Sequence, residues 1–459
     1  MAIPPLGLLY IASALRNRCK DYNIKIIDLM QQELNTDEFV RTLRDFSPDA
    51  IGFSSFPYEF NIFKKLSILA REILPESILI SGGLLATNYY SDLVRNELAD
   101  FAVLGEGELT INELFDALDN DRDPCSVKGI AYFKNDKVIL TAPREFIKDL
   151  DKIPLPSWDL INLKSYSKIP NWNGILFKKY YAPILTSRGC VYNCIYCNPL
   201  FGKTFRARTP ANVISEIEIL YKDYGIREFH IIDDLFNFDS ERVRNICKGI
   251  LEKRLKIKIS FPNGLRADRM DKETLKLLKA AGTYKINYAV ESANPRIQTL
   301  IRKNLDLEKT KEIIEETSKL GIITFGFFMF GFPTETVDEM RETISFAVNS
   351  KLDTAKFLKV TAFHNTALSE LAPGFVYGDD LRYNEEDVYY GESINYTNLP
   401  TPVLNNLVLE GMWKFYTNLG RIFRIVIKYH NIMVIKKIFE IYFYVLIRKE
   451  ADNNTQARF

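Results

Sequence analysis

Hydrophobic positions in the first 118 residues alternate between two spacings. Short β-branched runs suited to buried strands lie at 24–28, 50–54, 78–81 and 101–104. Helical spacing is found between them, at 6–15, 37–46 and 60–73. This alternation predicts a parallel sheet with helices on both faces. The chain opens directly with a helix that has Pro at its start, so we expect either that the sheet lacks its first strand or that the chain is a shortened version of a longer one.

A second series of strands and helices begins near residue 182. Its strands are predicted at 182–187, 228–233, 258–263, 284–291, 322–330 and 355–362. Six such units predict a partial (β/α) barrel, whose site would lie at the carboxyl ends of the strands. Between the two series, residues 129–142 predict a hairpin around Asn135 and Asp136, followed by a Pro-rich connector.

The chain beyond about residue 375 is aromatic and basic, and its pattern predicts helices. In one interpretation these helices pack on the barrel and leave their basic face in solvent. In the other they form an amphipathic element at a membrane surface, which would suit a lipid-like substrate. The expected units are 1–120, a hairpin and linker at 121–175, the barrel at 176–372 and a helical region at 373–459.

Composition and charge narrow the function classes. The 459 residues include 60 Lys and Arg against 59 Asp and Glu, a net charge of +1. A net charge this close to zero produces no overall electrostatic attraction for nucleic acid, so no nucleic-acid partner is expected. The N-terminus has no basic region ahead of its apolar stretch, and the sequence contains no run of about 18 uncharged apolar residues. A cytoplasmic location is therefore expected.

Three of the six cysteines crowd into eight positions. Cys190, Cys194 and Cys197 follow a predicted strand in a C-x3-C-x2-C spacing, which favours a metal site in a reducing compartment over disulfides. Iron–sulfur clusters select thiolates, and a cubane held by three of them leaves one iron open. Structural zinc is the alternative, but no fourth Cys or His lies near enough in the sequence to complete it.

The segment TSRGCVYNCIYCN resembles the signature of the radical S-adenosylmethionine (SAM) superfamily, including the aromatic Tyr196 before the third Cys. The resemblance implies a 4Fe-4S cluster held by Cys190, Cys194 and Cys197, with SAM bound at its open iron. It also implies SAM contacts at Tyr196 and, downstream and each after a predicted strand, at Asp233, Asp234, Arg266, Glu291, Ser292, Gly331 and Pro333.

These implied contacts divide by the part of SAM that each would touch. Asp233 and Asp234 stand where the superfamily usually has Gly-Gly-Glu, and they would bind the amino group. Glu291 and Ser292 would contact the ribose and carboxylate of SAM, and Arg266 would lie at the same end of the barrel. Gly331 and Pro333 would approach the adenine. Taken singly, each has a structural alternative: a helix cap, an Arg266–Asp268 ion pair or an ordinary turn.

The first 118 residues resemble the Rossmann-like cobalamin-binding domain that precedes many radical SAM barrels. The resemblance implies cobalamin contacts at Gly82, Gly83, Gly105, Glu106 and Gly107. The family commonly has Gly-Gly-Pro-His where this chain has Gly-Gly-Leu-Leu, and the loop that carries a cobalt-ligating His in some relatives is missing. All three His lie at position 230 or later, so no His ligand to cobalt is expected. The alternative is an empty domain that only docks on the barrel.

The resemblance implies an enzyme that generates a 5'-deoxyadenosyl radical from SAM and performs cobalamin-dependent methyl transfer to an unactivated carbon. A radical oxidative cyclase or oxidoreductase acting on a tetrapyrrole- or lipid-like substrate is the second candidate, by analogy with the anaerobic magnesium-protoporphyrin ester cyclases. An iron–sulfur electron carrier or docking module is the candidate from another class. The expected partners are a small-molecule substrate and a reducing donor such as flavodoxin or ferredoxin.

Overall fold

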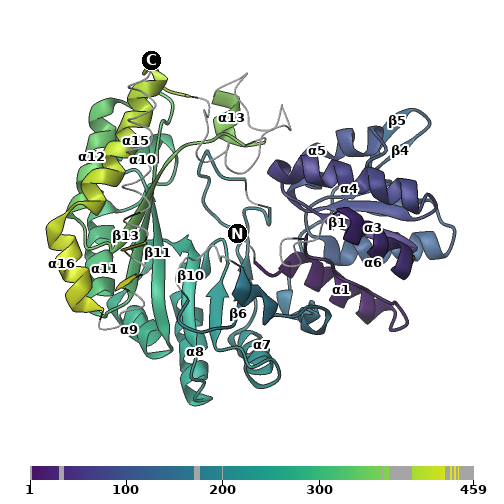
Figure 1. The fold of residues 1–459 in the computed structure, drawn as a ribbon, viewed down its shortest axis with the longest axis horizontal. Coiled ribbons are helices and arrows are strands. Elements are labelled where there is room, and N and C mark those ends of the chain that lie inside the picture. Colours follow the sequence, from purple (N-terminus) through teal and green to yellow (C-terminus); the bar gives the residue numbers. More distant parts are fainter. Residues whose placement is uncertain are drawn as a thin grey trace.

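The computed structural model places two α/β units side by side, with further helices on the outer flank of the larger one (Figure 1). It describes residues 3–29, 36–169, 176–198, 200–363, 365–371, 395–429, 435–436, 439–440 and 443. Within these ranges, no helix is long and apolar enough to cross a membrane.

The N-terminal unit is a five-stranded sheet in the order β1-β2-β3-β4-β5. Its first three strands are parallel and the last two are antiparallel: β1 Ala50–Ser54, β2 Ile78–Gly82, β3 Phe101–Val103, β4 Ile130–Lys134 and β5 Lys137–Leu140. Its helices are α1 Leu6–Arg18, α3 Thr36–Phe46, α4 Phe60–Ile73, α5 Gly83–Arg95 and α6 Gly107–Asp119. Successive residues of a strand point to opposite faces, so Leu79 packs against α3 and α4 while Ile80 packs against α6.

Two expectations for this unit need correction. Residues 24–28 were predicted as a strand, but they pair with no strand of the described structure, and Asp28 instead accepts a hydrogen bond from Tyr166 at 2.5 Å. The hairpin forms as predicted around Asn135 and Asp136, which both have positive φ. The first strand of the hairpin, β4, pairs with β3. The first sheet therefore extends past residue 120, where the end of the N-terminal domain was expected.

The second unit is the partial barrel, a parallel six-stranded sheet in the order β13-β12-β11-β10-β9-β6. Its strands are β6 Tyr181–Ile184, β9 Glu228–Ile231, β10 Lys258–Leu265, β11 Thr283–Glu291, β12 Ile323–Phe330 and β13 Thr354–Lys359. Each overlaps a predicted strand, because strands buried on both faces are nearly continuous apolar runs. The outer helices are α7 Pro210–Lys222, α8 Ser240–Glu252, α9 Lys272–Ala280, α10 Pro295–Leu300, α11 Leu307–Lys319 and α12 Val337–Asn349.

Shorter elements complete the described chain. A two-stranded ladder joins β7 Ser187–Arg188 to β8 Arg206–Ala207. A short helix, α13 Ala367–Leu371, follows the last barrel strand. The 3-10 helices are η1 Pro57–Glu59, η2 Pro124–Ser126, η3 Leu150–Lys152, η4 Trp158–Leu160, η5 Ser165–Lys168, η6 Phe236–Phe238 and η7 Ala267–Arg269.

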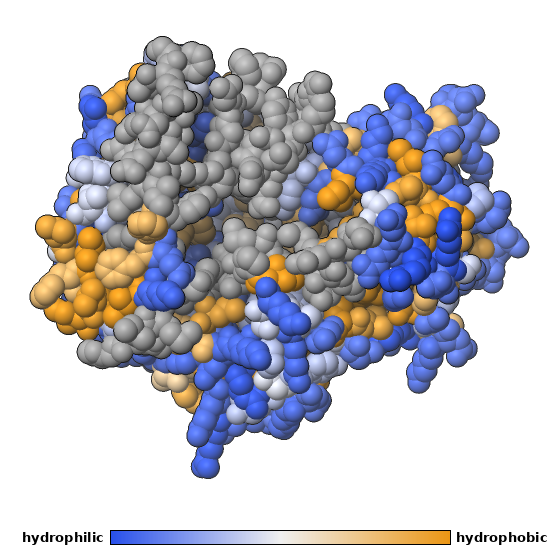
Figure 2. Space-filling model, in the orientation of Figure 1, coloured by the Kyte–Doolittle hydropathy of each residue, from blue (hydrophilic) through white to orange (hydrophobic). Residues whose placement is uncertain are grey.

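The described C-terminal residues form α15 Thr401–Tyr416 and α16 Leu419–Lys428, as the helical prediction requires. The basic side of α16, however, faces inward. Arg421 is 2% exposed and donates to carbonyls that include Ala347 and Val348 in the last turn of α12, where a helix leaves carbonyls without partners. The expectation of a solvated basic face is therefore wrong for α16. Its apolar residues form the hydrophobic patch at the left of Figure 2: Leu419, Phe423, Val426 and Ile427.

Candidate active site

The three clustered cysteines lie on one loop at the carboxyl end of β6. The ladder of β7 and β8 closes the base of this loop. Gly189 has φ +83, and a Cβ there would lie 2.3 Å from the carbonyl oxygen of Thr204, so the tight entry to the loop requires glycine. The N–H of Cys190 donates to the carbonyl of Gly202 at 3.1 Å. The cysteines are therefore presented by a short, closed loop, which we call the cluster loop (residues 189–205).

The chemistry of the three thiols fits an iron–sulfur cluster. Cys190, Cys194 and Cys197 are all free of disulfides. Burial, followed by the charge of Cys194, raises the pKa of Cys197 to about 12, and burial also raises the pKa of Cys190. These two thiols are thus hard to ionise unless a cation compensates their charge, which is what metal binding supplies. In the described part of the chain, no trio of His, Cys or acidic side chains forms a ready-made metal site.

The two aspartates predicted for SAM have different surroundings. The carboxylate of Asp233 is buried and accepts hydrogen bonds from the N–H of Thr186 at 2.6 Å, from Thr186 Oγ1 at 2.5 Å and from Ser187 Oγ at 2.6 Å. Asp234 is exposed, and its carboxylate accepts from the N–H of Gly189. Asp233 therefore fastens the end of β9 to the residues that lead into the cluster loop, and Asp234 is the carboxylate available to a ligand.

Arg266 is engaged by protein groups. Its Nε and NH2 donate to Asp268 at 3.0 and 2.7 Å, and its NH1 donates to the carbonyl of Lys303 at 2.9 Å. The guanidinium also stacks on the ring of Tyr192, with 3.8 Å between its carbon and the ring centroid. The structural alternative, an ion pair with Asp268, is thus present. Because Tyr192 lies between two of the cysteines, Arg266 supports the cluster loop.

The end of β11 carries a buried charge pair that faces the cluster loop. Glu291 has φ +67, and its Oε1 accepts a hydrogen bond from Lys303 Nζ at 3.1 Å. Lys303 Nζ also lies 3.3 Å from the hydroxyl of Tyr196. Ser292 is fully buried and lies 3.2 Å from Thr343 Oγ1. Sequence reasoning missed Lys303, whose one signal was its place after the short helix that follows β11.

The loop after β12 lies beside the same tyrosine. Gly331, at φ +95, and Phe332 both donate their N–H groups to Glu335 Oε2, at 2.8 and 3.1 Å. Burial raises the pKa of Glu335 to about 8. The Phe332 ring centroid lies 5.8 Å from that of Tyr196. The segment that contains Gly331 and Pro333 is therefore adjacent to the cluster loop, as a SAM contact would require.

The carboxyl edge of the N-terminal sheet faces the barrel site. Asn88 on α5 accepts hydrogen bonds from Asn198 of the cluster loop at 3.5 Å and from Asn365, beyond β13, at 3.3 Å. Thr87 Oγ1 accepts from the N–H of Gly105 at 3.1 Å and donates to the carbonyl of Gly83 at 2.9 Å. Ligands of open α/β sheets bind at this edge, and its amides and hydroxyls suit a cofactor rich in amide groups such as cobalamin.

The predicted cobalamin residues do not share one environment. A Cβ at Gly83 would approach the carbonyl of Ser55 to 3.2 Å, and one at Gly107 would lie 2.8 Å from Ile11 Cδ1, so both glycines permit close packing within the domain. At Gly82 and Gly105, added Cβ atoms would meet neighbours only at 3.7 and 4.0 Å. Gly82 and Gly105 are therefore the two glycines at which backbone has room to approach a cofactor.

The side chain of Glu106 joins the two units. Its Oε1 accepts from Arg188 NH1 at 3.0 Å and from Arg206 NH1 at 2.8 Å, and its Oε2 accepts from the N–H of Ile147 at 2.7 Å. With its oxygens taken by these donors, the side chain is committed to the domain interface. Burial alone would lower the pKa of Arg188, but the carboxylates of Glu108 and Glu106 hold that pKa above its ordinary value.

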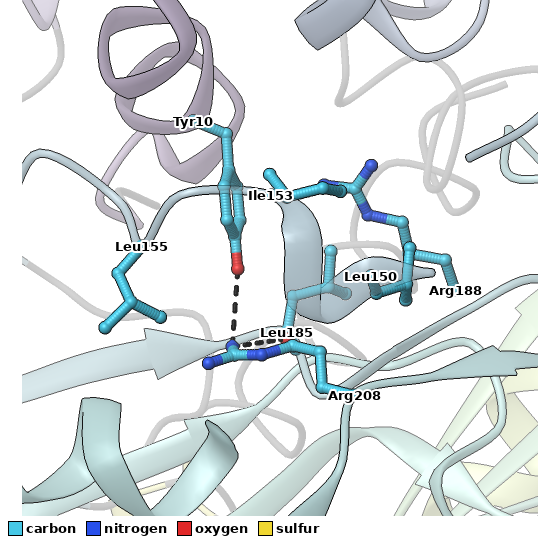
Figure 3. Close-up of a pocket in the computed structure, with 7 residues that line it drawn as sticks. All are labelled: Tyr10, Leu150, Ile153, Leu155, Leu185, Arg188 and Arg208. Carbon is cyan, nitrogen blue, oxygen red and sulfur yellow. Dashed lines mark hydrogen bonds between the residues drawn. The ribbon is translucent and has the colours of Figure 1, made fainter. Parts of the chain in front are cut away.

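The same interface contains a small cavity lined by Tyr10 and two arginines (Figure 3). Arg208 NH1 donates to the hydroxyl of Tyr10 at 3.4 Å and to the carbonyl of Leu185 at 3.0 Å. Arg188 stacks over the Tyr10 ring at 5.2 Å. The interface therefore includes specific contacts between Tyr10 of α1 and the arginines that lie on or next to the β7–β8 ladder.

Two family models match the chain, one on each unit. Residues 184–347 match the model of the radical SAM superfamily, and residues 1–115 match that of the B12 binding domain. The first match includes the cluster loop and the ends of β9 to β12. The second includes the sheet edge that faces them.

Whole-chain comparisons agree with these matches. The chain is 30% identical over 426 residues to an uncharacterized methyltransferase of Pyrococcus horikoshii, covering 92% of this chain and 83% of that one. It is 27% identical to the anaerobic magnesium-protoporphyrin IX monomethyl ester cyclase of Cereibacter sphaeroides, covering 83% of this chain and 62% of the cyclase.

A solved structure shares the fold of both units. The radical SAM methyltransferase TsrM from Kitasatospora setae superposes with a TM-score of 0.67 at 19% identity, covering 81% of this chain and 73% of that one. With the relative at 30% identity, the two domain models and the cysteine loop, this leads to one conclusion. The chain belongs to the radical SAM superfamily, in a branch with an N-terminal B12-binding domain, and is an enzyme whose cofactors are a 4Fe-4S cluster, SAM and cobalamin.

Proposed function

We propose that this enzyme transfers a methyl group to an unactivated carbon of a small-molecule substrate, with cobalamin as the methyl carrier. The observation that carries the proposal is the placement of the B12-type sheet edge directly against the cluster loop, through Asn88, Asn198 and Asn365. A relative named as a methyltransferase that covers 92% of the chain supports the same reaction class. When bound, the cluster and SAM supply radical formation and cobalamin supplies the methyl group.

The residues of the barrel mouth would hold and orient SAM. We assign the cluster to Cys190, Cys194 and Cys197, and the SAM amino group to Asp234, which lies on the loop side of β9. Lys303 and Glu291 form a charge pair that can accept the SAM carboxylate and ribose, because Lys303 offers ammonium protons and Glu291 a carboxylate. Gly331 and Pro333, next to Tyr196, would flank the adenine.

Other predicted residues would support the site without contacting the ligand themselves. Asp233 and Arg266 have their hydrogen-bonding atoms occupied by protein groups, and both support the cluster loop. Ser292 is buried against Thr343 and would set the backbone after Glu291. Gly82 and Gly105 would approach cobalamin through their backbone, whereas Gly83 and Gly107 allow close packing within the domain. No His precedes residue 230 in the sequence, so the protein offers no imidazole from this domain to cobalt.

A substrate-free experiment tests the proposal. The full-length protein is reconstituted anaerobically with iron, sulfide and hydroxocobalamin, reduced with titanium citrate and incubated with SAM. Loss of the SAM methyl group produces S-adenosylhomocysteine, and reductive cleavage produces 5'-deoxyadenosine. We expect both products.

The two products separate the candidates. 5'-Deoxyadenosine without S-adenosylhomocysteine would favour the oxidative cyclase, which has no need to demethylate SAM. Absence of both, with an intact cluster, would favour the electron carrier or docking module. The Asp234→Asn variant is the matched control, because it should lower both products without loss of iron.

Several expectations about partners stay predictions. The substrate is expected to be a small molecule, the electron donor a flavodoxin or ferredoxin and the location cytoplasmic. The alternative of membrane contact through the C-terminal region also stays open. Leu419, Phe423 and Ile427 are exposed on α16, while most of residues 430–459, which include the rest of that region, lie outside the described residues.

A further inference from the structure

A buried ion network joins the last loop of the B12-type sheet to the base of the cluster loop. Arg188 lies on β7, two residues before Cys190, and Arg206 pairs with it across the ladder on β8. Glu106 Oε1 lies 3.0 Å from Arg188 NH1 and 2.8 Å from Arg206 NH1. One carboxylate of the N-terminal unit thus holds both strands that close the loop.

The network is sealed from solvent and balanced in charge. The side chains of Arg188, Arg206 and Glu106 are 4%, 6% and 2% exposed. Glu108 adds a second carboxylate, 2.5 Å from Arg188 NH2. Two cations therefore face two anions. Such a group is stable only as a complete set, because removing one member leaves a buried charge without its partner.

The linker connects this ion network to Cys190, one of the proposed cluster ligands. The N–H of Ile147 donates to Glu106 Oε2 at 2.7 Å, and Arg206 NH1 donates to the carbonyl of Ile147 at the same distance. The neighbouring Phe146 ring packs so closely on Gly202 that a Cβ there would lie 2.4 Å from it. Gly202 in turn accepts the hydrogen bond from the N–H of Cys190. A continuous path therefore runs from Glu106 to Cys190.

We propose that Glu106 is a positioning residue of the iron–sulfur site: through Arg188 and Arg206, the B12-binding domain holds the cluster loop in the closed form that accepts the cluster. Its carboxylate acts through the two arginines, since both of its oxygens accept hydrogen bonds from protein groups. The barrel then depends on the other domain for the geometry of its own metal loop. This inference does not depend on methyl transfer, since it concerns the loop before any turnover.

Hydrogen exchange measured by mass spectrometry tests the inference on the full-length protein, before and after anaerobic reconstitution. Glu106→Gln keeps the shape of the side chain and removes its charge. Glu113→Gln is the matched control: Glu113 lies on the adjoining helix α6 and pairs with Arg144 of the linker, yet contacts neither strand of the ladder. Peptides that cover residues 189–205 report the loop, and peptides of β11 and β12 report the barrel.

We expect loop amides of Glu106→Gln to exchange about ten-fold faster, with barrel amides unchanged and Glu113→Gln equal to the wild type. Less iron should be retained, and the electron paramagnetic resonance signal of the reduced cluster should broaden. Unchanged loop exchange in Glu106→Gln would overturn the proposal. Equal acceleration throughout the barrel would also overturn it, because Glu106 would then serve general stability.

Glu106→Asp is the conservative variant, because it retains the charge with a shorter reach. We expect its loop exchange to fall between those of the wild type and Glu106→Gln. This variant also keeps the test decisive if Glu106→Gln does not accumulate as folded protein. Exchange in Glu106→Asp as fast as in an uncharged variant, or faster, would contradict a role that depends on the carboxylate charge.

Discussion

The two ends of the barrel both contain buried charged groups, but they use them differently. At the amino end, Glu228 Oε1 accepts from the hydroxyl of Tyr284 at 2.6 Å and lies 3.0 Å from His230 Nε2. Its Oε2 accepts from the N–H groups of Phe177 and Lys178. At the carboxyl end, the buried Glu291–Lys303 pair and the exposed Asp234 face the cluster loop.

This contrast shows that burial and charge do not by themselves mark a catalytic site. The Glu228 cluster is the more deeply buried of the two, yet each of its carboxylate oxygens is occupied by groups of the fold. The carboxyl end combines charges with glycine-containing loops and with cysteines that are only partly covered. The end of the strand at which a charged group lies is the better indicator of function.

The largest effect should come from removing a cysteine at the carboxyl end. Replacing Cys190, Cys194 or Cys197 singly with Ala should abolish iron binding after anaerobic reconstitution, because two thiolates cannot hold the cluster. Cys19→Ala and Cys247→Ala are the controls, since both residues lie outside the loop. Iron loss from either control, measured per chain, would mean that a ligand has been misplaced.

Matched glutamate variants compare the two ends directly. Glu291→Gln should weaken SAM binding roughly 10- to 100-fold, the value of a charge-assisted hydrogen bond, and should also lower the melting temperature, because the buried Lys303 loses its charged partner. Glu228→Gln should leave SAM affinity unchanged and destabilise the fold by about 3 kcal/mol, because several buried donors lose their charged acceptor. Calorimetry with SAM and thermal unfolding measure the two quantities. Weaker SAM binding in Glu228→Gln, with unchanged SAM affinity in Glu291→Gln, would place the functional charges at the amino end of the barrel.

The two aspartates after β9 sharpen the comparison within the carboxyl end. Asp234→Asn should reduce SAM affinity about ten-fold and keep the iron content. Asp233→Asn should lower the melting temperature and the iron content together, because three hydrogen bonds fasten the loop to this carboxylate. Wild-type SAM affinity in both variants would show that neither carboxylate serves the ligand.

The smallest effect concerns pH and the amino end. Burial lowers the pKa of Lys285 from 10.5 to about 7, although the charge of Glu228 raises it. At a pH between these two pKa values, Lys285 binds its proton in the unfolded chain more tightly than in the folded one. The free energy of unfolding should therefore rise as pH increases from 7 toward 10. Lys285→Met should flatten this rise and raise the melting temperature at pH 7. Thermal unfolding across this range measures both, and an unchanged slope in the variant would contradict the assignment.

The sequence was most informative where local pattern and structure coincide. Buried parallel strands are apolar runs, and all six barrel strands were placed within a few residues. The cysteine spacing located the metal loop because all three ligands belong to one short segment. Local pattern was less informative where tertiary contacts decide. Nothing local distinguishes Asp233 from Asp234, and nothing near Arg266 shows that the carbonyl of Lys303 occupies it.

The N-terminal unit was predicted less completely for the same reason. Residues 24–28 have strand composition, but their pairing depends on neighbours that local pattern does not specify. The hairpin at β4 and β5 was found from its turn, while its attachment to β3 depends on an edge formed thirty residues earlier. Glu106 was assigned to a cofactor because its loop resembles one that binds cobalamin. Its partners, Arg188 and Arg206, lie 82 and 100 residues further along the chain.

That separation has a consequence for how the enzyme is made. During synthesis Glu106 leaves the ribosome well before Arg188 and Arg206, and domains generally fold as units in N- to C-terminal order. Until the arginines arrive, its carboxylate must stay hydrated, because burying it alone would cost several kcal/mol. We therefore expect the segment around Glu106 to close late in the folding of its own domain, when the barrel docks. If Glu106 positions the cluster loop, iron–sulfur insertion should follow assembly of the two units and not the folding of either one alone.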